Sequence, residues 1–130
     1  NRGIVYFDLK NYTQAINDFN KAIELNPQFV KAYYNRGVAY NSLGMYEQAL
    51  NDLNIAIELN PQDATVCHTR GITYVNSGNY QKAIIDLQKA IELDPGYAEA
   101  YYNTGLVYQR IGDSENALVY FNKASELSRK

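Results

Sequence analysis

The residues best suited to chemistry are Cys67 and His68, the only cysteine and the only histidine in the chain. A thiol and an imidazole form a nucleophile–base pair when their side chains lie within hydrogen-bonding distance. Adjacent residues on a helix point about 100° apart, so these two side chains cannot meet. We therefore expect Cys67 to be a small buried core residue and His68 to be exposed beside it, and we expect neither to be catalytic.

Other catalytic or metal-binding patterns are missing from the sequence. It contains no G-x-G-x-x-G or P-loop motif and no H-E-x-x-H motif. A single cysteine can form neither an internal disulfide nor a cysteine metal site. Glutamates that recur every 34 residues are expected on a solvated face rather than in acid–base pairs; they are Glu24, Glu58, Glu92 and Glu126. We expect no enzyme activity, no cofactor and no metal within these residues.

Arginine and aspartate recur together, with the aspartate sixteen positions after the arginine. The pairs are Arg2 and Asp18, Arg36 and Asp52, and Arg70 and Asp86. At the next occurrence both partners change at once, to Thr104 and Tyr120. This joint loss predicts that each arginine bonds to the aspartate of its own pair, with a structural role.

These residues recur because the whole sequence repeats every 34 positions. Small residues mark the period: glycine at Gly3, Gly37, Gly71 and Gly105, and alanine at Ala15, Ala49, Ala83 and Ala117. Proline closes three units, at Pro27, Pro61 and Pro95. A strict period in this range indicates a repeat architecture. The repeats span approximately 1–29, 30–63, 64–97 and 98–130, the first one truncated, within one domain over 1–130.

Each unit is expected to form two helices. In the second unit the apolar spacing predicts helices over 30–43 and 46–59, with Gly44 ending the first. Gly37 and Ala49 are small residues on the facing helices, which lets the two backbones approach closely. Proline is expected to end the second helix and to open the next one at its first turn.

At this point the chain resembles the tetratricopeptide repeat family, over essentially its whole length. The resemblance rests on the 34-residue unit, the small residues at these phases, the tyrosine three positions after each glycine, and the closing proline. It implies an all-α solenoid of stacked antiparallel helix pairs that winds into a right-handed superhelix. It also implies that partners bind in a concave groove lined by the first helix of each unit.

The resemblance assigns the following residues to that concave face: Tyr34, Asn35, Val38, Asn41, His68, Thr69, Ile72, Tyr102, Asn103, Leu106 and Gln109. Some family members bind the terminal carboxylate of chaperones with lysine, arginine and asparagine at the positions equivalent to these residues. Here Tyr34 and Tyr102 stand where lysine would be useful, and Thr69 and Asn103 where arginine would. We therefore expect no chaperone carboxylate clamp.

Composition excludes other partners. The net charge of −2 argues against nucleic acid, and no apolar run is long enough to span a membrane. A lone thiol favours a reducing compartment, the cytoplasm. We also expect frayed residues 1–8, repeats that once continued before Asn1, and a natural end near Lys130.

The expected function is a protein–protein interaction module that binds an extended or helical peptide segment in its concave groove. The alternative is a module for self-assembly, as a homo-oligomer, or for contacts within a larger protein that carries a catalytic domain elsewhere.

Overall fold

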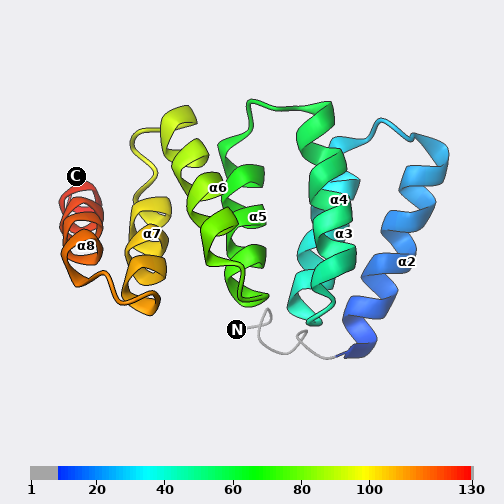
Figure 1. Ribbon diagram of the computed structural model, residues 1–130. Helices are drawn as coiled ribbons and strands as arrows, with labels where there is room; N and C mark the ends of the chain where they lie inside the picture. The colour runs from blue at the N-terminus through cyan, green and yellow to red at the C-terminus, as the bar shows by residue number, and fades with distance from the viewer. Residues whose placement is uncertain (1–8, 130) are drawn as a thin grey trace. The chain divides into compact units, whose positions relative to one another are not determined.

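The computed structural model (Figure 1) describes the backbone of residues 9–129 and the side chains of residues 12–129. These residues form seven α-helices and no strand. The chain divides into two compact units, Asn1–Pro61 and Gln62–Lys130. The predictions for residues 1–8 and for the partner of Asp18, Arg2, concern positions outside the described residues.

Antiparallel packing of successive helices builds each unit. The first unit contains α2 (Leu9–Leu25), α3 (Val30–Ser42) and α4 (Tyr46–Leu59), with α3 packed against both of the others. The second unit contains α5 (Ala64–Asn76), α6 (Tyr80–Leu93), α7 (Ala98–Arg110) and α8 (Ser114–Ser128). Consecutive helices of this unit pack against each other, and α5 also contacts α7. The predicted all-α helical repeat is confirmed, and α4 has the bounds that the sequence predicts, whereas α3 ends one residue early.

Glycine lets the two helices of a pair approach closely, as predicted. A Cβ atom on Gly37 would lie 3.0 Å from the Cγ atom of Leu53 and 3.4 Å from the carbonyl oxygen of Ala49. Gly71 stands in the same relation to Leu87, again at 3.0 Å. Because both leucines are fully buried, a larger residue at either glycine would have to displace core atoms.

A second set of glycines ends the first helix of each pair. Gly44, Gly78 and Gly112 have φ angles of +80°, +84° and +87°, a region that favours glycine. Gly44 is the helix-ending position that the sequence predicts, and Gly78 and Gly112 stand 34 and 68 positions after it. The sharp reversal that they allow brings the second helix back along the first.

The prediction that proline opens the following helix is wrong. Pro61 lies in the turn before Asp63, and α5 begins only at Ala64, where Asp63 caps it by accepting bonds from Thr65 and Val66. In two other turns the side chain of the residue before proline accepts a hydrogen bond from the backbone two residues later, within the turn itself. Asn26 Oδ1 accepts from the Gln28 backbone N–H at 3.1 Å, and Asp94 Oδ1 accepts from the Gly96 N–H at 3.2 Å.

Helix α7 lies on a surface provided by α5 and α6. Val107 of α7 is fully buried in one cluster with Ala83 and Leu87 of α6. Partly buried side chains of α5 and α6 complete the cluster; they include Ile72, Val75 and Ile84. We call this surface the α5–α6 seat.

Candidate functional site

The arginine–aspartate pairs lie inside the helix pairs, as the sequence predicts. Arg36 on α3 donates from Nε and Nη2 to the two carboxylate oxygens of Asp52 on α4, at 2.8 and 2.6 Å. Arg70 and Asp86 form the same bidentate pair at 2.8 and 2.8 Å. Hydrogen bonding to the buried aspartate raises the pKa of each arginine above its ordinary value. Because each arginine is bonded to an aspartate on the other helix of its pair, the two ion pairs have a structural role.

In the last repeat an aromatic cluster replaces the ion pair. Tyr120 stacks on Tyr108 with ring centroids 5.5 Å apart, and its hydroxyl accepts a bond from Gln88 at 3.3 Å. Thr104, which stands where arginine stands in the other repeats, is fully buried and donates to the Ala100 carbonyl at 2.7 Å. The hydroxyl groups of Tyr120 and Thr104 are therefore both hydrogen-bonded, and neither needs a charged partner.

Cys67 is buried, as expected, and burial raises the pKa of its thiol. The expectation that His68 is exposed is wrong: its side chain is 9% exposed. Asn103 of α7 donates to Nε2 at 2.8 Å, so Nδ1 carries the proton and donates to the Tyr97 hydroxyl at 3.1 Å. His68 thus ties α5 to α7 and is not an open binding residue.

The other residues that the resemblance assigns to a concave face differ in how exposed they are. In the first unit all four, Tyr34, Asn35, Val38 and Asn41, are half-buried on α3. On α5, Thr69 and Ile72 are half-buried, and Ile72 belongs to the α5–α6 seat, so its packing role is established. On α7, Asn103 and Leu106 are half-buried, whereas Tyr102 and Gln109 are exposed, Tyr102 by 50%.

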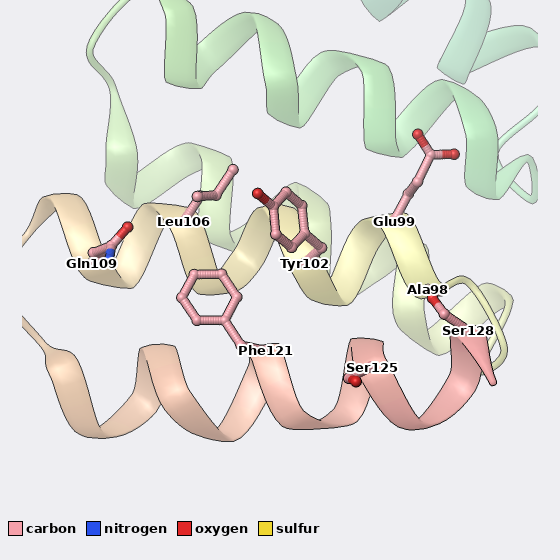
Figure 2. A pocket seen from close by; sticks show the side chains of 8 residues that line it. All are labelled: Ala98, Glu99, Tyr102, Leu106, Gln109, Phe121, Ser125 and Ser128. Carbon is pink, nitrogen blue, oxygen red and sulfur yellow. The ribbon is translucent and has the colours of Figure 1, made fainter.

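Three of these residues, Tyr102, Leu106 and Gln109, line a hollow between α7 and α8 (Figure 2). The hollow has a volume of about 730 Å³ and is completed on α7 by Ala98 and Glu99. Its size lies in the range of pockets that hold small ligands or partner side chains. Within the described residues, this is where predicted binding residues gather around an open volume.

Helix α8 supplies the other wall of the hollow, which sequence reasoning missed. This wall consists of Phe121, Ser125 and Ser128. The Phe121 ring packs against the Tyr102 ring, with centroids 5.5 Å apart. A signal was present in the sequence: Ser125 replaces the isoleucine that stands at this phase in the other repeats, for example Ile91. This polar substitution indicates that α8 differs here from the second helices of the other repeats.

Two other kinds of site are not found among residues 9–129. No cluster of histidine, cysteine and acidic side chains there has the arrangement of a metal site. None of the described helices is both long and apolar enough to cross a membrane. The four glutamates that recur every 34 residues are all exposed, as predicted.

Comparison with known proteins identifies the repeat. Residues 3–44 and 71–112 match a model described as TPR repeat, and residues 30–63 and 98–130 match two models described as tetratricopeptide repeat. No curated protein sequence matches this chain.

Solved structures agree with the family models. A crystal structure of MamA has a TM-score of 0.87 and 32% identity, covering 98% of this chain and 74% of that chain. MamA from residue 41 to its end, from Desulfovibrio magneticus RS-1, has a TM-score of 0.87 and 30% identity, covering 98% and 72%. The family models together with these structures indicate a helical-repeat scaffold for contacts with other proteins. The chain therefore belongs to the tetratricopeptide repeat family.

Proposed function

We propose that the chain binds an extended or helical segment of a partner protein on the faces of its first helices. The observation that carries this proposal is the hollow beside α7, where Tyr102, Leu106 and Gln109 surround an open volume of about 730 Å³. An apolar floor with a few polar groups at its edge is the usual composition of a recognition site.

The side chains on this face suit protein recognition. Tyrosine offers a large contact area with few rotatable bonds and a polar tip, and it is enriched among residues that dominate binding energy. Tyr102 is the half-exposed example, and Gln109 carries an amide that can donate to or accept from a peptide backbone. Glu99 is the charged residue in the lining, so binding should depend only weakly on salt.

Calorimetric titration tests the proposal, using a partner protein captured by this chain. Tyr34→Ala and Tyr102→Ala should each weaken binding by about 1–3 kcal/mol if these tyrosines are anchors. Glu47→Ala and Lys82→Ala are matched controls, because both residues are exposed on second helices, and they should change little. Equal losses from all four variants, or none from the tyrosines, would place the binding site elsewhere.

Self-assembly is the second candidate function. It is favoured by two apolar side chains on α8, Leu118 and Val119, which are 60% and 61% exposed. Exposed apolar groups of this kind are typical of interaction surfaces when they lie together. Light scattering over a range of protein concentrations separates the two functions, because a reversible oligomer supports self-assembly and a monomer supports partner binding.

A further inference from the structure

A polar hollow in the first unit is lined by side chains of α2, α3 and α4. It has a volume of about 510 Å³. Helix α3 contributes Arg36 and Tyr40, and α4 contributes Gln48 and Asp52. Helix α2, from the preceding repeat, contributes Glu24. A volume of this size can hold a side chain of another protein.

The same positions line a smaller hollow one repeat later, in the second unit. Its volume is about 150 Å³, and four of its lining residues stand 34 positions after lining residues of the first hollow; they are Arg70, Tyr74, Lys82 and Asp86. Here the Lys82 ammonium group lies over the Tyr74 ring, with Nζ 5.8 Å from the ring centroid. At this distance the electron-rich face of the ring attracts a cation. The chain itself thus shows which group fits against this tyrosine.

The first unit lacks this lysine, because Gln48 stands at the position of Lys82. In the last repeat the equivalent ring, Tyr108, is covered in another way, by the stacked ring of Tyr120. Among the described residues, Tyr40 has neither a cation nor a second ring over it. The tyrosine that two repeats cover is therefore open to the larger hollow in the first unit.

The charges around the larger hollow also favour a cation. Arg36 and Asp52 neutralise each other through their two hydrogen bonds. Glu24 is exposed and forms no ion pair with any residue that the structure describes. The lining therefore carries one negative charge in excess. A ring face and a negative charge, which together attract an ammonium group, are both present in this hollow.

We propose that this hollow binds a lysine side chain of a partner protein, whose ammonium group lies over the Tyr40 ring as that of Lys82 lies over Tyr74. The amide oxygen of Gln48 can accept a hydrogen bond from the ammonium group. Ile23, which also lines the hollow, suits the apolar stem of a lysine. The site lies on other helices than the hollow beside α7, so it is a second contact surface and does not depend on the proposed function.

Nuclear magnetic resonance titration of the whole chain with the peptide acetyl-Gly-Lys-Gly-amide tests the proposal. The same peptide with an acetylated lysine side chain is the control ligand, because acetylation removes the charge. The lysine peptide should shift signals of α2, α3 and α4, and it should bind weakly because it offers a single side chain. The acetylated peptide should produce no such shifts.

Variants of exposed residues locate the binding site. Gln48→Lys should weaken binding of the lysine peptide by about tenfold or more, because the new lysine then lies in the hollow as Lys82 does. Gln14→Lys is the matched control: it adds the same charge on α2 outside the hollow and should leave binding within about twofold. Glu24→Gln should weaken binding by about two- to fivefold, whereas Glu47→Gln, outside the hollow on α4, should change it by less than about 1.5-fold.

Four results would overturn the proposal. They are an absence of shifts on α2, α3 and α4, equal binding of the acetylated peptide, equal effects of Gln48→Lys and Gln14→Lys, and tighter binding of the diamine putrescine, which would make the hollow a site for a small amine. Circular dichroism checks that each variant remains folded. Because the peptide takes the place of the captured partner, failure of this experiment leaves the proposed function standing. A captured partner that is insensitive to Tyr34→Ala and Tyr102→Ala would likewise leave the lysine site standing.

Discussion

Removal of Asp52 tests the energetic role of the ion pair between α3 and α4. The side chain of Asp52 is 4% exposed, and Arg36, 20% exposed, donates two bonds to it. Truncation to alanine leaves a largely buried guanidinium without its carboxylate, and breaking such a pair costs about 3–5 kcal/mol. Arg36 keeps its 2.6 Å bond to Asn20 and some contact with water, so we expect the lower end, about 3 kcal/mol.

The fourth repeat suggests a compensating change. The double variant Arg36→Thr with Asp52→Tyr copies Thr104 and Tyr120, and it removes both charges at once. Replacing both partners of a buried pair is often neutral or stabilising, because no unpaired charge remains. We expect the double variant to recover most of the loss, since Tyr40 stands at the position of Tyr108 and can stack on the new tyrosine.

Urea denaturation followed by circular dichroism measures the free energy of unfolding of each variant. Glu126→Ala is the control, because it breaks the exposed Lys123–Glu126 pair, with side chains 46% and 65% exposed, and should cost less than about 1 kcal/mol. A loss for Asp52→Ala no larger than that of the control would refute the reasoning. So would a double variant less stable than the single one.

Three further predictions concern the second unit. Gly71→Ala should lower the free energy of unfolding by about 1–3 kcal/mol, because its Cβ would lie 3.0 Å from Leu87, whereas Gly96→Ala should change it by less than about 0.5 kcal/mol; urea denaturation compares the two. Burial lowers the pKa of His68, so below about pH 6.5 the unfolded chain binds a proton that the folded chain resists, and stability is lost as the pH falls. As the pH is lowered below about 6.5, the urea midpoint should fall more steeply for the native chain than for His68→Gln. Parallel slopes for the two proteins would contradict a lowered pKa of His68. Cys67 should react with a thiol reagent only as fast as the unit opens, so rapid labelling in the absence of denaturant would show that it is not buried.

The repeat, its helices and its internal ion pairs could be predicted from the sequence because each depends on short separations along the chain. A helix pair spans fewer than 34 residues, and Arg36 and Asp52 lie on the two helices of one pair. Their joint replacement by Thr104 and Tyr120 therefore identified them as partners before any distance was known. Nearest-neighbour contacts of this kind dominate repeat proteins, which makes their fold unusually easy to read from a sequence.

The contacts of His68 required the tertiary structure. Its partners lie 29 and 35 positions away: Tyr97 directly precedes α7 and Asn103 lies on it. Adjacency to Cys67 gave no indication of either. Burial of a polar ring depends on whether a neighbouring helix supplies bonds to it. The side-chain bonds that Asn26 and Asp94 form in the turns around Pro27 and Pro95 were likewise visible only in the structure.

The sequence by itself determined the repeat, the helices and the residues that share a phase, because these follow from backbone geometry and spacing. The sequence could not determine which of the residues at equivalent positions of the repeats are covered by a neighbouring helix. Ile84 and Leu118 occupy the same position in successive repeats, yet Ile84 packs beside Val107 while Leu118 is 60% exposed. The difference arises because α7 lies against Ile84 and no described helix covers Leu118 to that extent. Whether a side chain belongs to the core or to a binding surface was thus decided by tertiary packing alone.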